Sequence, residues 1–171
     1  MDTQARGTRT GPDVESAGQD LTEVRRHRAE LLESINALEQ ALAAPTPGRE
    51  MPWATVVSAA LLDLSDDFRD HVQLTEGTTG LYTRVIRSSP RLAHEVDRLT
   101  KEHRMLSELV AELLSFVGLA DGPPARNDPT LGDPDEVRDR GTALIGALVR
   151  HRQRGADLVY EAYSVDIGGE D

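Results

Sequence analysis

The sequence predicts an all-α protein, an up-down-up-down bundle of four helices. Apolar side chains recur every three or four residues over long stretches, which is the pattern of helices packed side by side. Segments rich in proline, glycine and aspartate separate these stretches. No run of alternating β-branched residues supports a sheet. These three observations together define the fold class.

The first helix is expected from about residue 20 to residue 44. Asp20 can cap its N-terminus, and Glu23 three places later completes a capping-box pattern. The segment 44–48 contains two prolines, which end the helix because proline cannot continue it. Residues 1–18 are polar and lack periodicity, so we expect them to be disordered.

The second helix is expected to begin near Pro52, because proline suits the first turn of a helix. Its apolar pattern runs to about Glu76, where the segment 77–80 interrupts it. Helical spacing then resumes to about Arg87. We therefore expect a kinked second helix that continues beyond the interruption.

Two further helices complete the predicted bundle. The third is expected over residues 90–117, and a surface loop rich in glycine, proline and aspartate follows over residues 118–133. The fourth is expected over residues 133–164. With 171 residues, the chain should form one domain. The bundle would occupy residues 19–165, and residues 166–171 would form a C-terminal tail.

The composition argues against several functions. A formal net charge of −11 disfavours nucleic-acid binding, because phosphates would be repelled. No apolar run approaches the roughly 20 residues of a membrane span, and the N-terminus lacks the apolar segment of a signal peptide. The absence of cysteine excludes disulfides and iron–sulfur clusters. We expect a cytoplasmic protein with neither nucleic acid nor membrane as a partner.

Histidines form the candidate site. His71, His103 and His151 each lie on the apolar face of a different predicted helix, and His27 lies beside the apolar row of the first. Antiparallel neighbours can bring all four to similar heights, given a rise of about 1.5 Å per residue. Helical bundles build metal sites from such converging side chains. His94 lies off the apolar face and should point to solvent.

The sequence around these histidines resembles the bacterial hemerythrin-like proteins, also called HHE cation-binding domains. The resemblance covers about residues 20–165 and rests on RRHRAELL (25–32), FRDHVQLTE (68–76) with Gly80-Leu81-Tyr82, LTKEHRML (99–106) and LVRH (148–151). It implies a four-helix bundle that holds two irons bridged by oxygen and carboxylates. Such bundles bind dioxygen, sense oxygen or nitric oxide, or handle iron. The resemblance also implies that His27, His71, His103 and His151 are the ligands of the four helices.

The second predicted helix departs from the family pattern at its carboxylate. The family has a glutamate four places after the histidine, where this chain has Thr75, and Glu76 comes at the fifth place. One residue turns a helix by about 100°, so Glu76 should point away unless a kink at Gly77 turns it back.

The last two predicted helices depart from the pattern as well. Ser107 stands where the family often has a second histidine, and Gly155 and Ala156 stand where it has a carboxylate, with Asp157 one place later. Without bridging carboxylates, little offsets the repulsion between two nearby dications. We therefore expect either one metal held mostly by imidazoles or no stable metal.

The candidate metal ligands are His27, His71, His103, His151, Glu76 and Asp157. Iron is the expected metal, although imidazole-rich sites also suit zinc, copper and nickel. The expected partners are the metal ion and a small diatomic ligand, and an oligomer or a protein partner is also compatible with the sequence.

Three functions are compatible with this pattern. The first is binding or sensing at a metal centre, because no nucleophile–base pair or phosphate loop indicates an enzyme. The second is a metal-free interaction or regulatory module whose histidines form a polar core. The third, a di-iron oxidase, requires Glu-x-x-His pairs. The four histidines are instead preceded at minus three by Val24, Phe68, Thr100 and Leu148.

Overall fold

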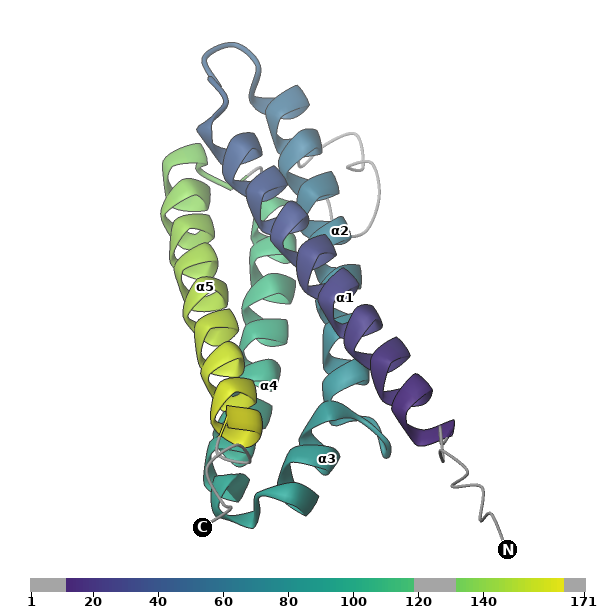
Figure 1. Cartoon of the computed structure of the whole chain (residues 1–171). Helices are drawn as coiled ribbons and strands as arrows, with labels where there is room; N and C mark the ends of the chain where they lie inside the picture. Colours follow the sequence, from purple (N-terminus) through teal and green to yellow (C-terminus); the bar gives the residue numbers. More distant parts are fainter. Residues whose placement is uncertain (1–11, 119–131, 165–171) are drawn as a thin grey trace, which may run out of the picture.

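The computed structural model describes residues 12–118 and 132–164, and it describes side chains for residues 26–118 and 132–163 (Figure 1). All of its regular elements in these ranges are helical. They are α1 (Pro12–Ala43), α2 (Glu50–Glu76), α3 (Leu81–Ser88), the 3-10 turn η1 (Pro90–Leu92), α4 (Ala93–Val117) and α5 (Pro134–Ser164). The predicted all-α fold class is confirmed.

The four long helices form a closed ring. Helices α2 and α5 each pack against both α1 and α4, so every long helix has two neighbours. Consecutive long helices run in opposite directions (Figure 1). The connection between α1 and α2 lies at one end of the bundle, and α3 crosses between α2 and α4 at the other end. This is the predicted up-down-up-down arrangement.

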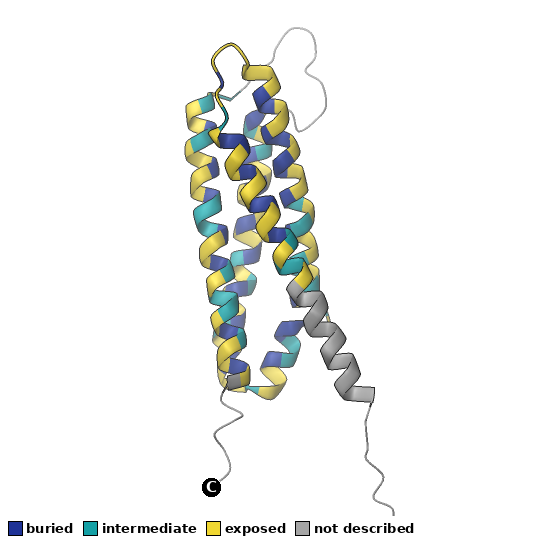
Figure 2. Ribbon diagram, turned by 45° about the horizontal axis from the view of Figure 1, so that its top comes forward, coloured by how far each residue is buried: buried dark blue, intermediate teal, exposed yellow. Residues whose placement is uncertain are grey.

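Apolar faces of the helices meet in two buried clusters, and buried and exposed residues alternate along each helix (Figure 2). The larger cluster spans the long helices and includes Phe68, Leu106 and Leu148. The smaller one lies at the α3 end and includes Leu99 and Leu158. Along α4 and α5, one histidine lies between the residues of the two clusters. A polar layer therefore separates two apolar ones.

The C-terminal end of α1 is tied to α2 and α5 by side-chain hydrogen bonds. Trp53 Nε1 donates to the carbonyl of Ala41 at 3.0 Å. Arg138 donates to the carbonyls of Leu42 and Ala44 at 3.0 and 3.1 Å. The last carbonyls of a helix lack partners within it, so these bonds satisfy groups that would otherwise be unpaired. They fix the end of α1 that is remote from His27.

The expected kinked second helix is in fact two helices. Helix α2 ends at Glu76 and α3 begins at Leu81. The turn between them is tight, with the Gly80 amide donating to the Gly77 carbonyl at 2.7 Å. A Cβ atom on Gly80 would lie 2.6 Å from the Thr75 carbonyl oxygen, so only glycine fits. The turn therefore ends α2 and redirects the chain.

Other boundaries differ slightly from the sequence-based ones. Helix α1 begins at Pro12, so it includes residues 12–18 of the segment expected to be disordered, while residues 1–11 lie outside the described part. Most of the expected loop at 118–133 and the tail at 166–171 also lie outside it. Within the described residues, no helix combines the length and apolar character needed to cross a membrane.

Replacing Gly80 by alanine should destabilise the protein by about 1–3 kcal/mol, because its Cβ would collide with the backbone of Thr75 and Gly77. Gly155→Ala is the matched control. A Cβ there meets nothing within 4 Å, and alanine in a helix interior is favoured by up to about 1 kcal/mol. Urea unfolding of both variants measures the difference. Equal stabilities would contradict the tight turn.

Candidate metal centre

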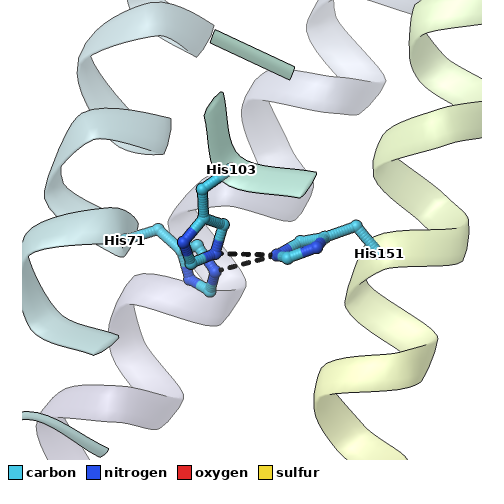
Figure 3. A group of neighbouring side chains, drawn as sticks. All are labelled: His71, His103 and His151. Atoms are coloured by element: carbon cyan, nitrogen blue, oxygen red, sulfur yellow. Dashed lines mark hydrogen bonds between the residues drawn. The ribbon is translucent and has the colours of Figure 1, made fainter. Parts of the chain in front are cut away.

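Three helices each deliver one imidazole to the polar layer of the bundle. His71 comes from the last turns of α2, His103 from the middle of α4 and His151 from α5, and their rings point toward one another (Figure 3). Their nearest ring nitrogens all lie within 4.8 Å of one another. The Nε2 atom of His151 is 3.0 Å from that of His103 and 3.4 Å from that of His71.

These separations suit a single metal ion. Imidazole nitrogens bind zinc and similar ions at about 2.0–2.1 Å, so two ligands of a tetrahedral ion lie about 3.3 Å apart. Ligands at right angles lie about 2.9 Å apart on the same bond lengths. The two distances from His151 Nε2, 3.0 and 3.4 Å, fall within or next to this range. The nitrogens of His71 and His103 lie within 4.8 Å of each other, so these two rings need only a small approach for the three imidazoles to hold one ion with open positions.

Carboxylates fix the outer nitrogens of two of the rings. His103 Nδ1 lies 2.5 Å from Glu76 Oε1, and His151 Nδ1 lies 3.0 Å from Glu102 Oε2. A carboxylate only accepts hydrogen bonds, so each Nδ1 carries the proton and each Nε2 presents its lone pair. Arg154 donates to the other oxygen of Glu102 at 2.6 Å and holds it in place. Carboxylates orient metal-binding histidines in this way.

The inward-facing lone pairs suit a cation between them. Without one, the Nε2 atoms of His103 and His151 oppose each other at 3.0 Å, and a shared proton or the nearby Tyr82 hydroxyl would have to supply a donor. Burial, with the neighbouring histidines second, lowers the pKa of His71 and His103 to about 3, so both rings are neutral near pH 7. Burial also lowers the pKa of His151, against the opposing effect of Glu102. A metal ion satisfies all three nitrogens.

The surroundings of the rings exclude most of the solvent. His103 and His151 are each 1% exposed. Phe68 contacts all three imidazoles, with ring centroids 5.7–6.2 Å apart. Tyr82 stacks on His103, and its hydroxyl lies 3.4 Å from His103 Nε2. Burial raises the pKa of Tyr82, so its hydroxyl keeps its proton and can donate a hydrogen bond.

The structure places the other proposed ligands elsewhere. His27 lies 3.1 Å from Glu30 through Nδ1 and lines a surface cleft with Asp70, outside the three-histidine group. Asp157 is exposed and accepts a hydrogen bond from Gln153 at 2.9 Å. Glu76 does reach the centre, but its oxygen meets the outer nitrogen of a histidine rather than the shared space. His94 is 86% exposed, as expected.

At the places where the family has further ligands, the side chains bond to the backbone. Thr75 donates to the carbonyl of His71 at 2.8 Å, and Ser107 donates to the carbonyl of His103 at 2.9 Å. Both hydroxyls are therefore used within their own helices. Gly155 has no side chain, and it borders a cavity beside the histidines.

Sequence reasoning did not find two features of the centre. One is Arg154, which lies one helical turn after His151 and holds Glu102. Its spacing from His151 was visible in the sequence, but its partner on α4 was not. The other is a pair of arginines, Arg28 and Arg152, that line the cavity next to His71. No local sequence signal relates residues so far apart.

Fold and site together define a class of protein, a four-helix bundle with a buried cluster of histidines suited to binding a cation. Comparison with known families makes the assignment specific, because residues 19–163 match the hemerythrin HHE cation-binding domain. The chain therefore belongs to this family, and the predicted resemblance is confirmed. Comparisons with curated proteins and with solved structures gave no match.

Acid should destabilise the metal-free protein by charging the buried imidazoles. The pKa of His71 and His103 is about 3 in the folded protein, whereas histidines of an unfolded chain bind protons near pH 6.5. The unfolded state therefore binds more protons as the pH falls from about 6.5 toward 3. Each histidine then removes up to about 1.4 kcal/mol of stability per pH unit.

Urea unfolding with chelator present, at several values between about pH 7 and about pH 5, measures this slope. That window lies above the titration of most carboxyl groups. Replacing the exposed His94 by glutamine should leave the slope unchanged, while His103→Gln should reduce it. A stability that stays constant across this window would contradict the burial of neutral imidazoles.

Proposed function

We propose that the protein binds one metal ion through the Nε2 atoms of His71, His103 and His151 and uses it to bind or sense a small ligand. The observation that carries the proposal is the convergence of three imidazole nitrogens within 4.8 Å in a buried layer. The two carboxylates on the outer nitrogens support it, because they direct the lone pairs inward.

Iron is the metal we propose for this site, on the strength of the resemblance to hemerythrin-like proteins. The donor set of three imidazoles also suits zinc, so direct metal analysis decides between them. A single ion is proposed rather than two, because Thr75 and Gly155 stand where bridging carboxylates would be needed. The positions of His27 and Asp157 do not support a role as ligands.

The remaining coordination positions would accept a small ligand such as dioxygen or nitric oxide, which is the chemistry that the bound metal supplies. The protein residues position the three imidazoles, exclude water through Phe68 and the apolar clusters, and offer the Tyr82 hydroxyl as a donor. No described group near the centre forms a nucleophile–base pair, so binding or sensing is proposed rather than turnover.

Elemental analysis of the purified protein should give about one metal ion per chain. Replacing His103 or His151 by alanine should abolish binding, because each removes one of three ligands. His27→Ala should retain the metal, since its ring lies outside the group, and His94→Ala is the exposed control. Loss of metal in His27→Ala would restore the four-histidine site expected from the sequence. Absence of stoichiometric metal in the wild type would favour the metal-free interaction module.

Replacing Glu102 by glutamine should weaken metal binding about 10- to 100-fold without abolishing it, because a neutral amide oxygen accepts the His151 Nδ1 proton more weakly than a carboxylate and the amide NH₂ can take its place. Glu95→Gln is the matched control, a carboxylate on the same helix that pairs with Arg98 at the surface. Competition with a chromophoric chelator measures both affinities. An unchanged affinity in Glu102→Gln would show that the 3.0 Å contact with His151 does not orient the ring.

A further inference from the structure

A small cavity lies directly beside the histidines. Its volume is about 20 Å³, which is room for one or two atoms of water size. Helices α1, α2, α3 and α5 all contribute to its wall. The polar residues that line it are Arg28, His71, Thr75, Tyr82, His151 and Arg152.

The charge in this wall is unbalanced. Arg28 and Arg152 come from different helices, and both are partly buried. Burial lowers the pKa of Arg28, and the nearby charge of Arg152 lowers it further. Where side chains are described, neither guanidinium has a carboxylate partner, and Arg152 Nε is buried without a hydrogen bond. Two cations therefore share one wall, and no carboxylate lies between them among the side chains that the structure describes.

Such an arrangement is costly unless an anion completes it. Like charges repel strongly where water is partly excluded, and a buried guanidinium donor that lacks a partner loses its hydration. The guanidinium group of arginine presents N–H donors in one plane, and their spacing matches the oxygens of a carboxylate or a similar oxyanion. Two small residues that border the cavity, Thr75 and Gly155, leave room for an added group.

We propose that this cavity binds a small planar oxyanion, of the size of formate or nitrite, between Arg28 and Arg152. A cavity of about 20 Å³ limits the occupant to a small ion: three bonded heavy atoms need a slight outward movement of the Arg28 and Arg152 side chains, and sulfate or phosphate needs a larger one. The site goes beyond metal binding and does not require it, because the two guanidiniums carry the charge that attracts the anion. A metal on the adjacent histidines would strengthen anion binding.

Formate binding to the metal-free protein tests this site. Isothermal titration and thermal unfolding, with chloride replacing formate at constant ionic strength, should show saturable binding and a rising midpoint. Sulfate should give no saturable effect. Arg28→Gln and Arg152→Gln should each weaken formate binding at least tenfold. Arg150→Gln is the matched control, since it removes an exposed guanidinium from the same helix and should bind formate like the wild type.

A second readout separates this role from a structural one. Without formate, Arg152→Gln should be at least as stable as the wild type, because the substitution relieves repulsion. A lower stability there, or equal formate responses in the wild type and in Arg152→Gln, would overturn the proposal. Loading the metal should tighten formate binding several-fold, and an unchanged affinity would place the anion elsewhere. If the protein binds no metal at all, the proposed metal-binding function is contradicted, but formate binding to the metal-free protein still tests the anion site.

Discussion

The hydrogen bonds on the outer face of the imidazoles determine what the centre can do. Glu76 and Glu102 hold the Nδ1 protons of His103 and His151, and this leaves the lone pairs facing a shared space. Reversing either ring would turn a donor inward and remove a ligand. The carboxylates are therefore as important as the histidines, although neither faces the shared space. The histidines lie between two apolar clusters, so a lone pair left without a partner there raises the free energy of the folded protein.

Glu76 reaches this position as the last residue of α2. Helical geometry places its side chain about 100° around the axis from that of Thr75, and its carboxylate meets the outer nitrogen of His103. The chain leaves the helix after it, in the turn at Gly77, and α3 then brings Tyr82 onto His103. A residue out of register for a metal ligand therefore serves as a hydrogen-bond partner. The same turn closes the end of the cavity at Leu81.

The bundle and its histidine layer could be predicted from the sequence because both depend on periodicity. His71, His103 and His151 lie in apolar rows, and such rows fix which way a side chain faces. The position of the His27 ring could not be predicted. His27 lies beside the apolar row of the first helix, so a small rotation of that helix decides whether the ring faces the bundle interior or the surface. The partners of Glu102 and Arg152 depend on contacts between distant helices. A single sequence holds no local signal for them.

The three imidazoles come from α2, α4 and α5, so coordination would join these helices and leave α1 outside the cross-link. Helix α1 is anchored by Trp53 and Arg138 near its C-terminal end, and by a hydrogen bond from Ser34 to Asp67 of α2 further along. Its opposite half, around His27, lies away from these bonds and outside the cross-link, so it can move without straining either. Opening there would uncover the wall that Arg28 contributes and give small solutes a route from solvent to the buried layer.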